Sequence, residues 1–402
     1  MNTRYFTSIG GNRHVIALSI ARMAEAIGNS ILFIVIPIYV AELPSLSFNW
    51  AVPIMVGVLI SLYGLINSIL QPFMGALSDR LGRRKILIQV GMLIMGVGTF
   101  GFSLADRYLH LVALRGLQGV GIAITIPAAM SLMAAVTKKE TRGGSMGIYS
   151  MLRMIGFTAG PVIGGFILVH FGFNAVFYTG TAFILLALVL VQWWVREVPV
   201  ENNNNAAKFK IFDRSLINPG ILSAMVATFI MAFSFSMVTT LENEFNAKLG
   251  IDALGFSIAI SSMMAGRILL QIPIGRLSDR IGRKPLIIGG LILMAPVSAL
   301  MGEVTALWQL IALRMIQGLA SGAIAAPAFA LVGDMGKSGG EGRQMSMITM
   351  GFGFGMAVGP LVAGILAVAF FQLPFYTAGA LCLVGAFIAY RNITETVTRK
   401  KR

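Results

Sequence analysis

Residues 75–85 read GALSDRLGRRK, and residues 275–285 read GRLSDRIGRKP. Each copy connects the end of one long apolar run to the start of the next, and each combines glycines, an aspartate and basic side chains. Three further pairs keep nearly the same spacing: RGLQG at 115–119 with RMIQG at 314–318, GPVIGG at 160–165 with GPLVAG at 359–364, and FYT at 177–179 with FYT at 375–377. The chain therefore contains an internal duplication.

The apolar runs around these motifs have the length of membrane-spanning helices, which need about 20 apolar residues. Barrel strands are shorter and alternate in polarity. Only 12% of the residues are charged and 56% are hydrophobic, whereas soluble domains have about 25% charged residues. This composition excludes a soluble globular protein, a disordered chain and a nucleic-acid binder, in spite of the net charge of +15. The sequence predicts twelve spanning helices, at about 15–41, 53–77, 86–105, 108–136, 145–169, 174–195, 217–241, 254–277, 286–303, 306–333, 345–370 and 373–390.

The positive charges are distributed asymmetrically between the two sides of these helices. If the N-terminus lies inside, nearly all loop lysines and arginines fall on the cytoplasmic side, and only Arg107 and Lys248 fall outside. Because cytoplasmic loops are enriched in these residues, we expect a multi-pass protein of the inner membrane with both termini in the cytoplasm. The first helix carries Arg22 and Glu25 and no cleavage site follows it, which argues against a signal peptide.

The duplication predicts two six-helix bundles, residues 1–196 and 217–402, joined by a polar cytoplasmic linker at 197–216. Six spans per half give both halves the same inside–outside sense, so their pseudo-twofold axis lies along the membrane normal. Paired bundles of this kind enclose a binding site near the midplane and suit alternating access. The predicted fold class is an all-α integral membrane protein with twelve transmembrane helices in two bundles.

The repeated loop motif and two motifs inside the spans resemble those of a known transporter family. Gly75-x-x-x-Asp79-Arg80-x-Gly82-Arg83 resembles the loop signature of the major facilitator superfamily, and the resemblance covers essentially the whole chain. Arg115-x-x-Gln118-Gly119 and the run from Gly156 to Gly165 resemble motifs of the twelve-span drug:proton antiporters. The resemblance implies a proton-coupled secondary antiporter that exports small amphipathic molecules or drugs.

The loop motif is expected to form a gate. Its glycines permit tight turns, and its aspartate can accept from a helix N-terminus and pair with a nearby arginine. By resemblance, this latch holds the outward-facing state. The expected gating residues are Gly75, Asp79, Arg80, Gly82, Arg83 and Glu140 in the first half, and Asp279 and Arg283 with either Asp334 or Glu341 in the second.

The antiporter motif of the fifth span places small residues at intervals of four, which lets helix backbones approach closely. It comprises Gly156, Gly160, Pro161, Gly164 and Gly165. We expect this row to pack against the eighth span, and the resemblance adds the control of leak. The related row from Gly355 to Gly364 in the eleventh span is expected to serve packing.

Glu25 is the one acid well inside a predicted span, about ten residues or ~15 Å from the cytoplasmic end. Burial disfavours the charged form of a carboxyl group, which makes Glu25 a candidate proton carrier. Arg22 lies one turn earlier and would favour the charged form. A static structural Arg22–Glu25 pair is the alternative. By resemblance, Arg115 faces the cavity and tunes proton exchange with Glu25.

Charges inside spans usually face a cavity or a partner, although snorkelling is an alternative for Arg22 and Arg153. Five such arginines against one deep acid favour a second hypothesis, namely an exporter or flippase of an anionic metabolite, siderophore or lipid held by arginines. Glu242 and Glu244 are expected to be outer-gate or loop charges rather than proton sites. The candidate substrate-cavity residues are Asn29, Arg153, Arg267, Gln118, Tyr63 and Phe233.

Other chemistry is not expected. The single cysteine, Cys382, excludes a disulfide framework, and the three histidines have no ligand-like spacing. We expect no metal, no cofactor other than the coupling proton, no catalytic residues and therefore no enzyme. The expected partners are a small-molecule substrate and the lipid bilayer, with the protein acting as a monomer and binding no nucleic acid. A non-transporting membrane sensor on the same fold is a third hypothesis.

Overall fold

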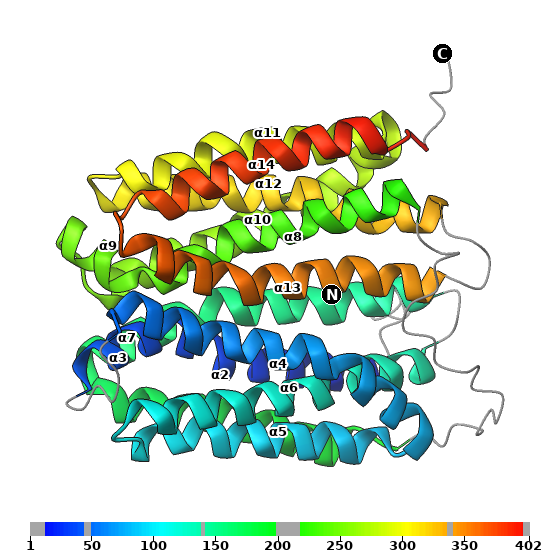
Figure 1. Ribbon diagram of the computed structural model, residues 1–402. Coiled ribbons are helices and arrows are strands. Elements are labelled where there is room, and N and C mark those ends of the chain that lie inside the picture. Colours follow the sequence, from blue (N-terminus) through cyan, green and yellow to red (C-terminus); the bar gives the residue numbers. More distant parts are fainter. Residues whose placement is uncertain (1–12, 44–49, 138–140, 198–217, 336–340, 397–402) are drawn as a thin grey trace. The chain divides into compact units, whose positions relative to one another are not determined.

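The computed structural model describes residues 13–43, 50–137, 141–197, 218–335 and 341–396. Within these ranges the regular structure consists of helices alone (Figure 1). The elements are α2 (Arg13–Ser30), α3 (Leu32–Glu42), α4 (Val52–Leu81), α5 (Arg84–Gly101), η1 (Phe102–Leu104), α6 (Tyr108–Val136), α7 (Arg142–Trp194), α8 (Pro219–Thr240), α9 (Glu242–Leu249), α10 (Ala253–Ile281), α11 (Arg283–Leu300), η4 (Met301–Glu303), α12 (Leu307–Met335), α13 (Glu341–Ala367) and α14 (Leu373–Asn392).

The described ranges contain 11 helical segments long and apolar enough to span a membrane. One of them, Gly144–Trp194, is 51 residues long. It belongs to α7, whose backbone leaves helical geometry at Gly172, where φ is 77°. Since both parts of α7 exceed the roughly 20 residues that a crossing needs, the predicted fifth and sixth spans are the two parts of α7. The predicted first span comprises α2 and α3.

Short polar signals set the helix ends outside the apolar runs. The Asn218 side chain accepts from the Gly220 N–H at 2.8 Å, and Pro219 occupies the first turn of α8. Asp252 caps α10 in the same way, accepting from the Gly255 N–H at 2.8 Å. Gly250 closes α9 with φ at 63°, a left-handed conformation that glycine adopts without steric cost.

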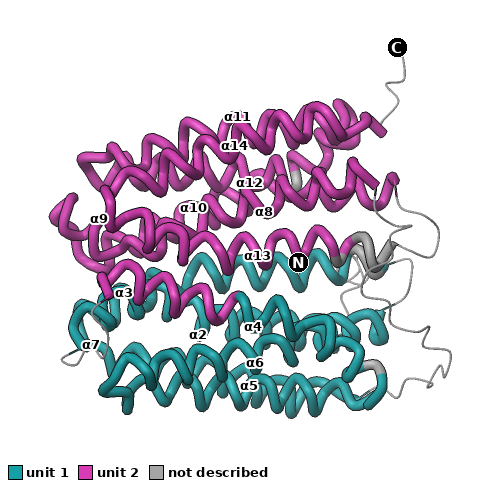
Figure 2. Tube along the Cα trace, in the orientation of Figure 1, with its two compact units in different colours: residues 1–49, 65–209 teal, residues 50–64, 210–402 magenta. Residues whose placement is uncertain are grey.

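The chain forms two compact units (Figure 2). Unit 1 comprises residues 1–49 and 65–209, and unit 2 comprises residues 50–64 and 210–402. The first part of α4, residues 50–64, therefore groups with unit 2. There a Cβ placed on Gly57 would lie 2.5 Å from the Pro360 carbonyl oxygen. The boundaries of the two repeats and of the linker stay predictions, because residues 198–217 lie outside the described ranges.

The two units repeat the same helix pairings. In unit 1, α2 packs on α7 and α5 packs on α6, whereas in unit 2 α8 packs on α13 and α11 packs on α12. The pairings match at single residues. Gly156 approaches the Met23 carbonyl oxygen and Gly160 meets Ser30, while Gly355 approaches the Phe229 carbonyl oxygen and Gly359 meets Ser236. Thus Met23 corresponds to Phe229, and Ser30 corresponds to Ser236.

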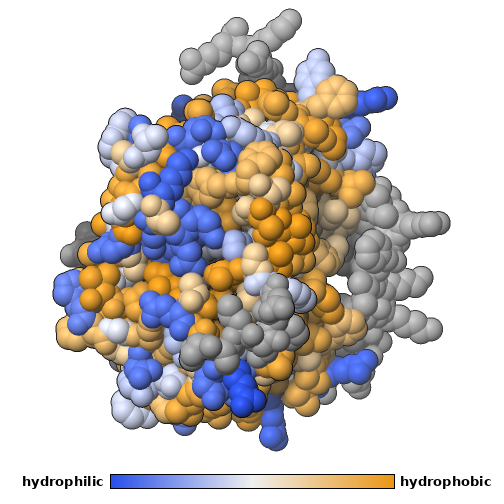
Figure 3. Space-filling view, turned by 60° about the vertical axis from the view of Figure 1, so that its left-hand side comes forward, coloured by the Kyte–Doolittle hydropathy of each residue, from blue (hydrophilic) through white to orange (hydrophobic). Residues whose placement is uncertain are grey.

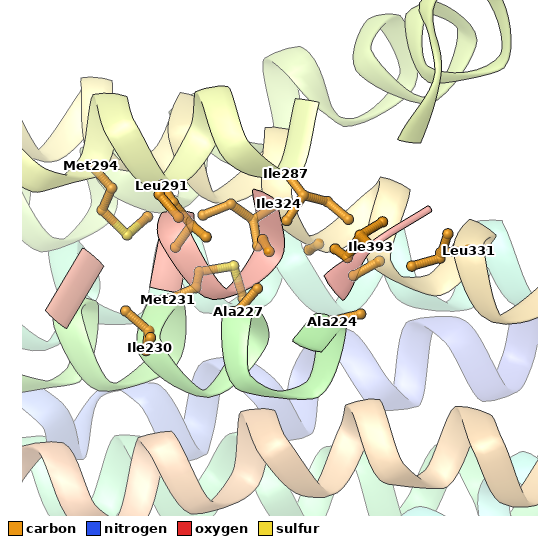
Figure 4. Close-up of a cluster of buried hydrophobic side chains, with 14 of the residues drawn as sticks. Ala224, Ala227, Ile230, Met231, Ile287, Leu291, Met294, Ile324, Leu331 and Ile393 are labelled. Carbon is orange, nitrogen blue, oxygen red and sulfur yellow. The ribbon is translucent and has the colours of Figure 1, made fainter. Parts of the chain in front are cut away.

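The core of unit 2 is apolar (Figure 4). Met231 of α8 and Leu291 of α11 have no exposed surface, and Ile324 of α12 completes the contact between these helices. Large apolar side chains also cover the outside of the helices, as Figure 3 shows in orange on one face. Leu104 is 71% exposed and Phe171 is 68% exposed. Such surfaces suit contact with lipid tails and not with water.

Candidate functional site

Glu25 and Arg22 form an ion pair inside unit 1. Only 1% of the Glu25 surface and 4% of the Arg22 surface are exposed. An Arg22 Nη1 hydrogen donates to Glu25 Oε2, three residues along α2. The deep acid predicted from the sequence is therefore inside the helix bundle of its unit, and the predicted partner holds it. Breaking a buried pair of this kind typically costs about 3–5 kcal/mol, because one charge stays uncompensated.

Two side chains of α7 extend this polar group. Tyr149 is 4% exposed and interacts electrostatically with Arg22, Glu25 and Arg153. The Arg153 guanidinium lies 5.2 Å from the centre of the Phe157 ring, in cation–π geometry. We call Arg22, Glu25, Tyr149 and Arg153 the acid cluster. Sequence reasoning missed Tyr149, although its position one turn before Arg153 in a glycine-rich span was an available signal.

The second repeat fills the same positions without charge. The correspondence of α2 with α8 and of α7 with α13 aligns the acid cluster with Thr228, Met231, Ile348 and Phe352. Thr228 Oγ1 donates to the Ile348 carbonyl oxygen at 3.3 Å, so these positions meet in unit 2 as well. Met231 and Ile348 belong to the apolar core shown in Figure 4. Unit 2 therefore folds with uncharged residues at these positions, and the charges of unit 1 need a reason other than folding.

The antiporter motif holds α7 against the helix that carries Glu25. A Cβ on Gly156 would lie 2.5 Å from the Met23 carbonyl oxygen and 2.8 Å from the Ala26 Cβ. A Cβ on Gly164 would lie 3.2 Å from Ile31. The expected partner was the eighth span, but the close contacts recorded for these glycines are with α2. Pro161 lies within α7, where the backbone stays helical.

Arg115 and Arg314 occupy equivalent buried positions, each with 1% of its surface exposed. Arg115 donates to Gln118 Oε1 at 3.1 Å, and Gln118 donates to Thr99 Oγ1 at 2.9 Å. Arg314 donates to Gln317 Oε1 at 2.6 Å and to the Phe235 carbonyl oxygen at 3.2 Å. The acceptors of these arginine hydrogen bonds are amide and backbone carbonyl oxygens.

The candidate cavity residues divide between the units. Asn29, Gln118 and Arg153 lie in unit 1, and all three are at least partly buried. In unit 2, the Arg267 guanidinium lies 5.8 Å from the centre of the Phe352 ring. Phe233 is 3% exposed and stacks on Phe229. Tyr63 is partly buried in the part of α4 that belongs to unit 2.

The second copy of the gating motif is a network around Arg283. Its Nη1 donates to Asp279 Oδ1 at 2.6 Å, and its Nε donates to Asp334 Oδ2 at 3.0 Å. Thr396, beyond the last helix, donates to the same Asp334 oxygen at 2.8 Å. Of the two acids offered by the sequence, the one shown at Arg283 is Asp334, because the side chain of Glu341 lies outside the described residues. The network joins the ends of α10, α11 and α12.

In the first copy, Arg83 is exposed and precedes α5, whereas Arg84 is buried and donates to the Ser131 carbonyl oxygen at 3.1 Å. Arg80 is exposed, and the Asp79 side chain and Glu140 lie outside the described residues. The predicted turns are confirmed, because φ is 62° at Gly82 and 108° at Gly282. A close approach at Gly75 is not seen within its unit, where a Cβ would meet Pro127 at 3.6 Å, an ordinary contact.

An acid from the end of each repeat caps the helix that follows the motif. The Glu197 carboxylate accepts from the N–H groups of Arg84 and Lys85, both at 2.9 Å. The Glu395 carboxylate accepts from those of Arg283 and Lys284 at 3.0 and 3.1 Å. A carboxylate on two free N–H groups is favoured by the positive end of the helix dipole. The sequence analysis did not identify either acid. Glu197 and Glu395 each lie shortly after the last span of a repeat, and this matching position was the available signal.

Replacing either capping acid with alanine is expected to destabilise the protein. The first turn of α5 or α11 loses two charge-assisted acceptors, which costs about 1–2 kcal/mol for each helix. Thermal unfolding of Glu197→Ala and Glu395→Ala in detergent measures the loss. Glu42→Ala, which removes an exposed acid at the end of α3, is the matched control and should unfold like the wild type. Equal unfolding temperatures for all four proteins would contradict the capping role.

Glu242 departs from the expectation for a loop charge. None of its surface is exposed, and neither carboxyl oxygen has a hydrogen-bond partner among the described residues. Burial raises the pKa of Glu242 well above its usual range. Glu244 is partly exposed, and burial of its carboxyl group raises its pKa as well. Glu242 is therefore not an exposed loop charge, and its role at an outer gate stays a prediction. Phe245, on the same helix, packs against Phe256, Phe371 and Phe375 of unit 2.

The long apolar helices and the duplicated helix pairings define a multi-pass membrane transporter fold. The Major Facilitator Superfamily model matches residues 18–239 and 224–402. The chain belongs to the Major Facilitator Superfamily, and it is a transporter and not an enzyme.

Curated relatives and solved structures agree with this assignment. The multi-drug resistance efflux pump PmrA of Streptococcus pneumoniae is 27% identical over 359 residues, covering 86% of this chain and 87% of PmrA. The multidrug resistance protein MdtG of Salmonella typhimurium is 27% identical over 367 residues, covering 89% and 90%. A bacterial homologue of the human lysosomal transporter Spinster has a TM-score of 0.78 at 14% identity, covering 97% of each chain. The likeness to that structure concerns the fold alone.

Proposed function

We propose that this transporter is a proton-coupled antiporter that exports small amphipathic molecules, including drugs, across the inner membrane by alternating access, with both termini in the cytoplasm. The names of the relatives PmrA and MdtG support drug efflux. The observation that carries the coupling is the acid cluster. It contains a buried ion pair on α2, the helix against which the glycines of α7 pack, and the second repeat has the uncharged residues Thr228 and Met231 at the equivalent positions.

Protonation of Glu25 removes the negative charge that compensates Arg22. A buried arginine left without its partner destabilises that arrangement by about 3–5 kcal/mol. Moving a two-state equilibrium from 1:99 to 99:1 takes about 5.5 kcal/mol. A single proton at Glu25 therefore supplies most of the bias between the two access states. The glycines from Gly156 to Gly164 pack α7 closely against α2. A change of charge on α2 therefore acts directly on α7, the helix that carries the antiporter motif.

A second candidate function is export of an anionic metabolite, siderophore or lipid. The observation that favours it is Arg314, a fully buried guanidinium whose recorded acceptors are a backbone carbonyl and an amide oxygen. Arg267 lies in the same unit, over the Phe352 ring. An anion that entered this unit could pair with these two guanidinium groups.

Efflux of dyes with opposite charge separates the two functions. If the protein exports amphipathic drugs, Arg267→Ala is expected to leave efflux of the cationic dye ethidium at the wild-type rate or to raise it. The reason is that a positive charge no longer repels the dye. For the anion exporter, the same variant loses efflux of an anionic fluorescein dye by at least roughly tenfold, one lost charge-assisted contact. Arg196→Ala, at an exposed position after α7, is the control. Efflux of the anionic dye with none of ethidium would contradict the proposed function.

A further inference from the structure

Glu242 is a second buried acid, and it differs from Glu25 in having no hydrogen-bond partner among the described residues. Both of its oxygens are buried without a hydrogen bond, whereas Glu25 is held by Arg22. When the two repeats are aligned through α2 and α8, Glu242 corresponds to Ile36, and Glu25 corresponds to Met231. Glu242 is thus not a repeat copy of Glu25. It lies three turns further along, where α8 ends and α9 begins.

The one basic residue of α9, Lys248, is engaged away from Glu242. On α9, Lys248 donates to the Gly302 carbonyl oxygen at 2.6 Å and lies 5.0 Å from the centre of the Phe371 ring. Three further acids lie on α9, at the start of α10 and on η4, namely Glu244, Asp252 and Glu303. The arginines of α10 lie further along that helix, at Arg267, Arg276 and Arg280. Asp252 caps α10, and Glu303 accepts from the Tyr376 hydroxyl. Burial by itself accounts for the raised pKa of Glu242.

Most of the buried atoms near Glu242 that lack a hydrogen bond among the described residues are acceptors. Besides its own oxygens they are Glu244 Oε2 and Asn246 Oδ1, and the Thr240 hydroxyl is the one that can also donate. Residues four apart share a helix face, so Asn246 lies on the face of Glu242, one turn later. A proton on the Glu242 carboxyl group converts one of its oxygens into a donor and can satisfy an acceptor on that face. An unprotonated carboxylate cannot donate, so it leaves the Asn246 oxygen unsatisfied and keeps a charge in a buried setting, which is strongly unfavourable.

We propose that Glu242 is a second proton-binding site of this transporter, which keeps its proton while buried and releases it when the junction of α8 and α9 opens to water. A metal cation fits less well. Glu242 and Glu244 are two residues apart on one helix and do not face each other, so their carboxylates do not form one ligand shell. The part played by Glu242 in coupling rests on the proposed antiport, whereas its protonation does not.

Infrared titration of the reconstituted full-length protein tests the protonation directly. We expect a C=O stretching band of a protonated carboxyl group at neutral pH, lost in Glu242→Gln and retained in Glu25→Gln and Glu244→Gln. Glutamine mimics the neutral acid, so the variant should fold. A band of unchanged intensity in Glu242→Gln, or no such band in the wild type, would overturn the proposal whatever the transport assays show.

Thermal unfolding as a function of pH gives an independent readout. The folded pKa of Glu242 is raised, so the folded state holds a proton that the unfolded chain releases. The pKa of a glutamate in the unfolded chain is about 4.3. Above that pH the wild-type protein should become less stable as pH rises, with the unfolding constant increasing by at most about tenfold per pH unit. The decrease should stop once the pH exceeds the pKa of Glu242 in the folded state. Glu242→Gln should lack this component. Stabilisation by Na⁺ that disappears in Glu242→Gln would instead assign the site to a metal cation and overturn the proposal.

Discussion

Replacing Glu25 with glutamine is expected to abolish transport driven by a proton gradient while the folded protein persists. Glutamine keeps the shape of the side chain and an acceptor for Arg22, but it cannot exchange a proton. If coupling supplies about 3–5 kcal/mol of bias, its loss reduces gradient-driven ethidium export by at least about a hundredfold. The measurement is ethidium efflux from membrane vesicles with an imposed pH gradient.

Two controls make this result specific. Glu42→Gln changes an exposed acid at the end of the same span and should export ethidium like the wild type. The double variant Arg22→Thr/Glu25→Met installs the residues that unit 2 uses at the equivalent positions. Because replacing buried ion pairs by apolar groups is often neutral or stabilising, we expect it to fold at wild-type yield and to lack coupled transport. Coupled export by either variant of Glu25 would show that the pair is only structural.

The second large effect is expected at Gly160. A Cβ at this position would overlap Ser30 Oγ and lie 2.8 Å from the Ile27 carbonyl oxygen. Gly160→Leu therefore forces α7 away from α2 and should cost about 1–3 kcal/mol or more, with loss of transport. Gly160→Ala should be milder. The readouts are the amount of folded protein after extraction, its unfolding temperature and ethidium efflux.

Gly147 provides the matched control on the same helix. A Cβ at Gly147 has no heavy atom within 4 Å, so Gly147→Leu should unfold and transport like the wild type. Combining Gly160→Ala with Ser30→Ala should recover only part of the loss, since the Ile27 carbonyl oxygen belongs to the backbone and stays in place. A Gly160→Leu protein that behaves like Gly147→Leu would show that the row of glycines does not hold α7 on α2.

The sequence predicted the architecture well because apolar length, charge and duplication act along the chain. The twelve spans, the turns at Gly82 and Gly282, and the Arg283–Asp279 pair all follow from residues close in sequence. The close packing of the Gly156 row is seen within unit 1, whereas its expected contact with the eighth span, which belongs to unit 2, stays a prediction. A row of small residues predicts close packing but does not name the helix that it meets. The row packs on α2, the helix of Glu25.

Burial at helix junctions was harder to predict. Glu242 follows an apolar span and precedes polar residues, so its sequence context is that of a loop, yet none of its surface is exposed. Tyr149 is an ordinary aromatic residue in the sequence and becomes part of the acid cluster only through the packing of α7 on α2. The capping acids Glu197 and Glu395 act on backbone groups more than a hundred residues away, where local pattern gives no guidance.

Proton movement coupled to substrate in reconstituted vesicles tests the central claim most directly. Vesicles containing the wild-type protein, loaded with a pH-sensitive dye and holding a preformed proton gradient, should lose that gradient when ethidium is added. Vesicles containing Glu25→Gln should keep it. Ethidium that crosses the wild-type vesicles without moving protons, or a gradient that collapses equally with Glu25→Gln, would contradict a transporter coupled through the Arg22–Glu25 pair.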